Sequence, residues 1–250
     1  MLRPLWIQNL KTGLYKERGI PVIKFLLLDL DDTILDFKLA EKIAISDTLR
    51  ELGIEPTEEI TSLYSEINKA CWEKLERGEY TRQEVLYNRF AILFEKLGVK
   101  LSPADTKKIY ETRLGIGHYF IPGAPEFLEK IKDKYELYIT SNGTAKVQSG
   151  RIASSGISKY FKEIFVSENL GVNKPSKLFF DKIFEKIDGF DKEKAIIVGD
   201  SLSSDILGGI NAGIKTCWFN PHHKENKTAY KPDYEIDSLD RLPELLKNIK

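Results

Sequence analysis

The chain has 250 residues, of which 42% are hydrophobic and 30% charged, so it has enough apolar material for a packed core beneath a charged surface. The 38 Lys and Arg residues balance the 38 Asp and Glu residues, which excludes binding to a nucleic acid polymer or an anionic membrane by overall charge. No apolar run reaches the roughly 18 residues that a membrane span requires. Cys71 and Cys217 lie far apart with no metal-ligand spacing, which favours free thiols in a reducing, cytoplasmic location.

The first strand is expected after an N-terminal extension of unclear role. Residues 1–21 are mixed and charged and lack the apolar stretch and cleavage site of a signal peptide, so they are left outside the predicted fold. From residue 22 the stretch "VIKFLLLDLDDT" predicts a buried strand that ends in Asp29, Asp31 and Asp32. If the extended geometry continues, Asp29 and Asp31 point to one site, because residues two apart on a strand share a face.

The next eighty residues or so have helical periodicity throughout. Apolar residues recur three and four apart in "AEKIAISDTLRELG", "TEEITSLYSEINKACWEKLERG" and "TRQEVLYNRFAILFEKLG", and a fourth helix follows Ser102. Thr57 and Ser102 are expected to cap the second and fourth helices. The length of the chain lies between one and two typical domains, so we predict that residues 37–118 form a helical bundle inserted into a single core domain.

After this block, short apolar runs alternate with helical segments. The runs lie in "YELYITSNG", "FKEIFVSENLG", "AIIVGDS" and "KTCWFN", with helices expected near 125–133, 145–155, 176–187 and 203–212. Such alternation is typical of a parallel sheet covered by helices on both faces. The predicted fold is therefore α/β, with a doubly wound parallel sheet built from residues 22–36 and 119–250.

Polar side chains follow most of the predicted strands. Ligands of doubly wound sheets bind beyond the carboxyl ends of the strands, so these residues are expected to meet. They are Asp29, Asp31, Asp32 and Thr33 after the first strand, Ser141, Asn142 and Gly143 after the second, Lys174 in a later loop, and Gly199, Asp200, Ser201 and Asp205 after the strand "AIIV".

These residue types suit a phosphate group and a hard cation. Crowded carboxylates repel one another unless a cation neutralises them, and Mg²⁺ prefers oxygen ligands at about 2.0–2.1 Å. Asp29, Asp200 and the backbone of Asp31 can supply such ligands, while Ser141 and Lys174 can bind phosphoryl oxygens. A carboxylate whose charge is screened in this way can attack phosphorus as a nucleophile.

The motifs resemble those of the haloacid dehalogenase superfamily. "DLDDT" is similar to its first motif, DxDx(T/V), and "YITSNG" to its second, while Lys174 in "NKPS" and "VGDSLSSD" fit the third and fourth. The family resemblance covers residues 22–250 and implies an enzyme with a helical cap inserted after the first motif.

The resemblance also implies a role for each motif residue. Asp29 would be the nucleophile and Asp31 the general acid and base, with Ser141 and Lys174 holding the transferred group. Asp200 would bind Mg²⁺, and Asp205 would support the metal site or serve only as an acid at a helix N-terminus.

Three further residues complete this set of expectations. Asp32 has no assigned role and is expected to be a solvated or locally hydrogen-bonded turn residue. Asn142 and Arg89 are candidates for substrate contact, and Arg89 would otherwise belong to the core of the helical block.

The loops narrow the expected function. "TSNG", "VGDSLSSDILGGINAGI" and "CWFNP" are most similar to bacterial pyrimidine 5′-nucleotidases, which act on UMP, dUMP and dTMP. We therefore expect a Mg²⁺-dependent phosphomonoesterase, monomeric or homodimeric, whose partner is a small phosphorylated metabolite. The alternatives are a phosphatase or phosphomutase for phosphoglycolate or a sugar phosphate, a 2-haloacid dehalogenase, or a non-catalytic binding protein.

Overall fold

The computed structural model describes residues 23–249, so the predicted extension over residues 1–21 lies outside the described part of the chain. Within this range six strands form one sheet in the order β3-β2-β1-β4-β5-β6, and every neighbouring pair is parallel. The strands are β1 (Phe25–Leu28), β2 (Glu136–Ser141), β3 (Glu163–Val166), β4 (Ala195–Gly199), β5 (Lys215–Phe219) and β6 (Tyr234–Ile236). The predicted α/β fold with a doubly wound parallel sheet is confirmed.

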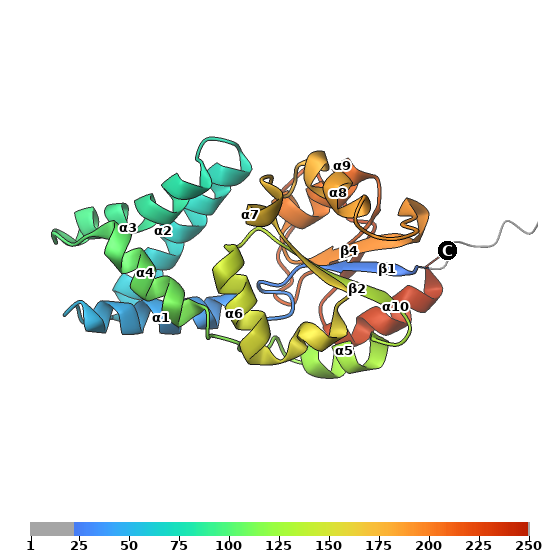
Figure 1. Cartoon of the computed structure of the whole chain (residues 1–250), viewed down its shortest axis with the longest axis horizontal. Coiled ribbons are helices and arrows are strands. Elements are labelled where there is room, and N and C mark those ends of the chain that lie inside the picture. Colours follow the sequence, from blue (N-terminus) through green and yellow to red (C-terminus); the bar gives the residue numbers. More distant parts are fainter. Residues whose placement is uncertain (1–22, 250) are drawn as a thin grey trace, which may run out of the picture.

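Strand β1 is apolar at every position because both faces of the sheet are covered. Leu26 and Leu28 pack in one hydrophobic cluster with residues of α5 (Ala124–Ile131) and α10 (Leu242–Asn248). Phe25 and Leu27 face the opposite cluster, which includes residues of α8 (Lys177–Phe184) and α9 (Leu207–Ala212). Figure 1 shows these two helical layers on either side of the strands. Burial on both faces explains why the sequence of this strand is a continuous apolar run.

The remaining core helices are α6 (Ala145–Ser155) and α7 (Ser167–Leu170). The sequence did not predict α7, α10 or β6, because elements of four and three residues are too short for a periodic pattern and α10 has only seven. The helix predicted near 203–212 is in two parts, a π-helical turn over Leu202–Ile206 and then α9. Such turns often occur at functional sites.

Four helices form the region inserted between β1 and α5. They are α1 (Phe37–Glu51), α2 (Glu58–Glu76), α3 (Arg82–Leu97) and α4 (Pro103–Leu114). Thr57 and Ser102 cap α2 and α4 as predicted, since each side-chain oxygen accepts a hydrogen bond from a backbone N–H in the first turn. Thr81 forms a reciprocal capping box with Glu84, which sets the start of α3.

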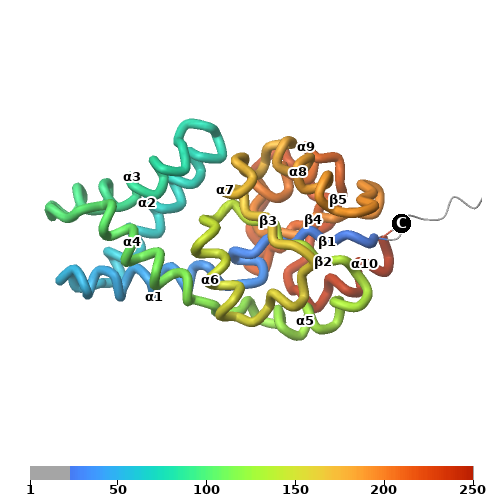
Figure 2. Tube along the Cα trace, viewed as in Figure 1, coloured from blue at the N-terminus to red at the C-terminus, as the bar shows by residue number. Residues whose placement is uncertain are grey.

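This helical region has a hydrophobic core of its own. The rings of Tyr64, Phe90 and Tyr110 pack against one another with centroids 5.4–5.5 Å apart, inside a cluster separate from those of the sheet. Figure 2 shows α1 to α4, in blue to green, lying to one side of the sheet and joined to it by the segments after β1 and before α5. None of the described helices is both long and apolar enough to cross a membrane.

We expect Phe90→Ala to lower the free energy of unfolding by about 3–5 kcal/mol, because it leaves a cavity in this aromatic cluster. The control is Tyr87→Ala, which removes an exposed ring from the same helix and should change stability by less than about 1 kcal/mol. Urea denaturation followed by circular dichroism measures both. Equal effects would show that the cluster does not stabilise the region.

Candidate active site

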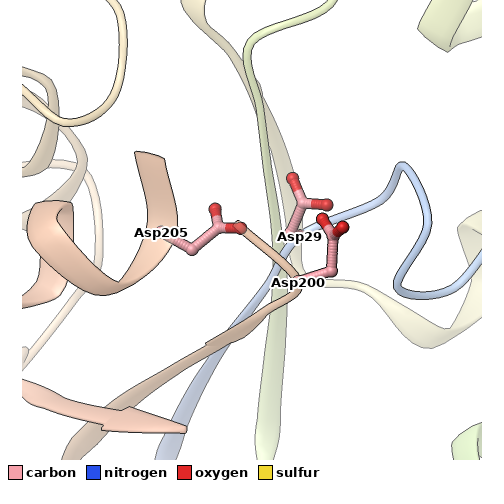
Figure 3. A group of neighbouring side chains, drawn as sticks. All are labelled: Asp29, Asp200 and Asp205. Carbon is pink, nitrogen blue, oxygen red and sulfur yellow. The ribbon is translucent and has the colours of Figure 1, made fainter. Parts of the chain in front are cut away.

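Three carboxylates meet at the carboxyl ends of neighbouring strands. Asp29 directly follows β1, Asp200 directly follows β4, and Asp205 lies in the π-helical turn beyond it. One carboxylate oxygen of each lies within 4.8 Å of the others, and Figure 3 shows the three side chains around a common space. Because β1 and β4 pair directly in the sheet, residues distant in the sequence are brought together.

Lys174 is the cation that bonds two of these three carboxylates. Its Nζ donates to Asp29 Oδ1 at 2.8 Å, to Asp205 Oδ1 at 2.6 Å and to the backbone oxygen of Thr140 at 2.7 Å, so all three of its N–H groups are used. The side chain is only 1% exposed. Burial disfavours its charged form, but the carboxylates of Asp205 and Asp29 outweigh that effect, and the pKa of Lys174 is raised.

One ammonium group does not balance three carboxylates. The pKa of Asp200 is raised well above its usual range, first by burial and then by the charges of Asp29 and Asp205. The pKa of Asp29 is also raised, mainly by burial, although Lys174 opposes the shift. A group of oxygen donors with excess negative charge fits a hard divalent cation such as Mg²⁺.

Gly199 makes room for Asp205. A Cβ at position 199 would lie 2.2 Å from Asp205 Oδ2, closer than real side chains approach one another. The same oxygen accepts a hydrogen bond from the backbone N–H of Ser201 at 3.1 Å. The glycine of the "VGDS" stretch therefore allows the buried carboxylate to pack against the end of β4.

Asp31 does not join the carboxylate cluster. The extended geometry predicted to continue through residue 31 ends at Leu28, and the chain turns. Asp31 Oδ2 accepts a hydrogen bond from Gln148 Nε2 at 2.6 Å, and Oδ1 forms an ion pair with Arg151, whose side chain is fully buried. Asp29 and Asp31 still line one cavity, because the turn rather than the pleat of a strand directs the second acid.

Gln148 also reaches the end of β2. Its Nε2 donates to Ser141 Oγ at 2.7 Å, and the same oxygen accepts from Gly143 N at 3.1 Å. Ser141 itself is buried and is not among the residues that line the cavity. The sequence motifs did not indicate a role for Gln148 and Arg151, although residues three apart lie on one face of a helix such as α6.

Asn142 holds the loop that carries Lys174. Its Oδ1 accepts from the backbone N–H of Lys174, and its Nδ2 donates to the backbone oxygen of the same residue, both at 2.9 Å. Asp32 lies outside this network. Its Oδ1 accepts from the backbone N–H groups of Phe37 and Lys38 at 3.0 and 3.2 Å, as expected for a locally hydrogen-bonded turn residue.

A cavity of about 190 Å³ extends from the carboxylates to the helical region. Its walls include Trp72, Glu76, Leu86, Arg89, Glu111 and Leu114 from that region. Arg89 is buried, and its Nη1 donates to Asn68 Oδ1 at 3.2 Å. Within residues 23–249, Arg89 Nε and Glu111 Oε1 have no hydrogen-bond partner. The structure therefore places Arg89 at the cavity, with donor capacity left over.

The chain is similar to one family model and to several known proteins. A family model described as "Haloacid dehalogenase-like hydrolase" matches residues 26–219. The chain is 42% identical over 228 residues to pyrimidine 5′-nucleotidase PynA of Streptococcus pneumoniae, which covers 90% of this chain and 96% of that relative. It is 31% identical over 222 residues to pyrimidine 5′-nucleotidase YjjG of Escherichia coli, covering 89% of this chain and 97% of the relative.

A solved structure of the putative HAD-hydrolase YfnB of Bacillus subtilis is similar to this chain. It superposes with a TM-score of 0.86 at 39% identity and covers 90% of this chain and 99% of its own. That structure is described as bound to magnesium and as revealing interdomain movement.

We expect Asp200→Asn to stabilise the metal-free protein, by about 1–2 kcal/mol, because it removes one of three repelling charges, two of which are buried and one half-buried. The pKa of Asp200 is higher in the folded than in the unfolded chain. The folded state then binds more protons, so the free energy of unfolding falls as the pH rises above about 4, and the variant should lose part of that slope.

The same substitution should abolish any increase in melting temperature produced by Mg²⁺. Differential scanning fluorimetry between pH 5 and 8, with and without Mg²⁺, measures both effects. Asp188→Asn removes an exposed acid and serves as the control. A less stable Asp200→Asn variant would contradict the repulsion described above.

Proposed function

We propose that this chain, which belongs to the haloacid dehalogenase-like hydrolases, is a Mg²⁺-dependent phosphomonoesterase that acts on nucleoside 5′-monophosphates through an aspartyl-phosphate intermediate. The resemblance to this enzyme family that the four motifs indicated is confirmed. The observation that carries the proposal is the buried cluster in which Lys174 bridges Asp29 and Asp205 beside Asp200. Two relatives of at least 31% identity named pyrimidine 5′-nucleotidase support the substrate class.

Asp29 is the proposed nucleophile. One of its oxygens forms a bond to phosphorus while the bond from phosphorus to the ester oxygen breaks, and Asp31 donates a proton to that leaving oxygen. In the second half of the reaction Asp31 accepts a proton from water, which attacks phosphorus and releases Asp29 and inorganic phosphate. Gln148 and Arg151 hold the Asp31 carboxylate at the cavity.

Lys174 is proposed to bind the oxygens of the transferred group. Its ammonium already lies 2.8 Å from the nucleophile, so an incoming phosphoryl oxygen can replace one of its present acceptors. Asp29, Asp200 and the backbone of Asp31 would hold Mg²⁺, with Asp205 supporting them, and the metal would neutralise charge on the phosphoryl group. Ser141 is proposed to assist through the loop that follows β2, since its hydroxyl bonds Gly143 N.

The inserted helices are proposed to act as a cap, over residues 37–118, that selects the rest of the substrate. Tyr64 and Phe90 are buried in the core of that region, whereas Trp72 lines the cavity and offers a ring for stacking. Arg89 and Asn142 both line the cavity and are proposed to contact the substrate. Within residues 23–249 the Nε of Arg89 has no hydrogen-bond partner, which supports this role, because such a buried donor gains from a ligand acceptor.

The proposal is tested by phosphate release from a panel of UMP, dUMP, dTMP, purine nucleotides, sugar phosphates and phosphoglycolate. We expect the highest kcat/KM for the pyrimidine nucleotides, no turnover in EDTA, and a loss of at least about 10⁴-fold for Asp29→Asn, because the amide cannot form the intermediate. Asp188→Asn is the matched control on an exposed acid.

Each outcome of this panel has a distinct meaning. Turnover without Mg²⁺, or activity that survives Asp29→Asn, would overturn the mechanism. Higher kcat/KM for a sugar phosphate or phosphoglycolate than for every nucleotide would retain the mechanism and overturn the substrate class.

Arg89→Lys keeps the charge but removes the planar donor group. We expect its kcat/KM for UMP to fall by about tenfold or more and its kcat/KM for methyl phosphate to fall far less, because the smaller ester does not reach the cap. Arg50→Lys, on the exposed face of α1, is the control. An equal loss for both esters would assign Arg89 to the fold of the cap instead.

A further inference from the structure

Arg82 crosses from the helical region to the core. It is the first residue of α3, and the capping box of Thr81 and Glu84 fixes the turn from which its side chain extends. Arg82 is half-buried, and its guanidinium lies 5.6 Å from the ring of Trp72, a residue of the cavity wall. The guanidinium therefore reaches the core along the edge of the cavity.

Four core acceptors receive its hydrogen bonds. Nη1 donates to the backbone oxygens of Asn142 and Gly143, both at 2.9 Å, and Nη2 donates to Ser167 Oγ at 2.5 Å and Asn173 Oδ1 at 2.6 Å. Asn142 and Gly143 lie in the loop after β2, Ser167 is the first residue of α7, and Asn173 lies in the loop after α7. Within residues 23–249 Arg82 forms no salt bridge, so neutral acceptors alone satisfy this cation.

The loops that Arg82 joins are those that hold the proposed phosphate-binding groups. The Asn142 side chain bonds both backbone groups of Lys174, and Gly143 N donates to Ser141 Oγ. Asn173 directly precedes Lys174 in the chain. Arg82 thus bonds Asn142 and Asn173, the residues next to Ser141 and Lys174 in the chain, and does not itself contact the carboxylate cluster.

A second contact flanks the cavity from the same part of the helical region. Glu76, at the end of α2, accepts a hydrogen bond from Ser203 Oγ at 2.7 Å, and Ser203 lies in the π-helical turn that carries Asp205. The segment from residue 76 to residue 82 therefore bonds the core on two sides of the cavity. Of the two contacts, only that of Arg82 has a planar donor with several bonds, which requires one orientation of the cap.

From this geometry we infer that Arg82 is a positioning residue that couples closure of the helical cap to the arrangement of the loops bearing Asn142 and Lys174. With the cap closed, the guanidinium orders both loops. With the cap moved away, the Asn142 and Gly143 carbonyls lose their donor and the loops loosen. By linkage, a ligand that orders these loops must favour the closed cap to the same extent. The kinetic consequence rests on the proposed phosphatase function, whereas the effect on loop order does not.

Three substitutions separate this role from charge and from packing. Arg82→Lys keeps the charge without the fork, and Arg82→Met keeps most of the stem without the charge. Arg77→Met is the matched control, because Arg77 lies on the same connection and is exposed, and its side chain bonds Glu79 rather than the core. Hydrogen exchange in the absence of substrate follows the amides of Gly143 and Lys174, whose bonds depend on these loops.

We expect both Arg82 variants to exchange these two amides about tenfold faster than the wild-type protein, with little change at β1 or in the core of α3. The kcat/KM for UMP should fall by about 100-fold in Arg82→Met, largely through kcat, and Arg77→Met should match the wild type. A fourth variant, Arg82→Ala, leaves space for a guanidinium ion, and added guanidinium should restore part of its activity and none of that of Asp29→Asn.

The remaining outcomes decide against the inference. Unchanged exchange in both variants would overturn it, and so would faster exchange spread over the whole chain with no rescue by guanidinium, which indicates a merely structural role. If Arg82→Met fails to fold, hydrogen exchange in Arg82→Lys alone decides. If the wild-type protein does not hydrolyse nucleotides but the local change in exchange is present, the proposed function fails and the positioning role of Arg82 stands.

Discussion

The rest of this structure depends on one constraint, the mutual repulsion of the carboxylates of Asp29, Asp200 and Asp205. Lys174 bonds two of them, Asp29 and Asp205. Their burial raises the cost of each charge, and one ammonium group offsets only part of it. A chain selected for stability alone would replace such a cluster with apolar residues of similar size. The energy stored there is available to a cation and to a phosphoryl group, because both lower the repulsion when they bind.

The apolar sheet makes this arrangement possible. Strands β1 and β4 are buried on both faces and pair along their length, so Asp29 and Asp200 cannot move apart without disturbing the hydrophobic core. The absence of a side chain at Gly199 lets Asp205 approach from the adjoining turn. Rigid strands thus hold the charges, while the loops around them carry the groups that can adjust.

The loops also connect the two parts of the molecule. Asn142 bonds the backbone of Lys174, Gln148 bonds both Ser141 and Asp31, and Arg82 reaches the same loops from the helical region. Each of these residues lies just outside the carboxylate cluster. Together they make the position of the helices and the geometry of the proposed phosphate site parts of one hydrogen-bonded network.

The sequence alone determined the doubly wound sheet and placed Asp29 and Asp200 at its carboxyl edge, because apolar runs that alternate with helices form parallel strands whose carboxyl ends share one edge. The sequence also determined the capping residues Thr57 and Ser102, because a cap bonds a backbone N–H only three residues further along the chain. Only the tertiary structure decided that Asp31 lies outside the carboxylate cluster and bonds Arg151 and Gln148 at the cavity, that Ser141 does not line the cavity, and that Arg82 reaches the core. These contacts join residues 7 to 120 positions apart through loops and a helix face, where no periodicity specifies which side chains touch.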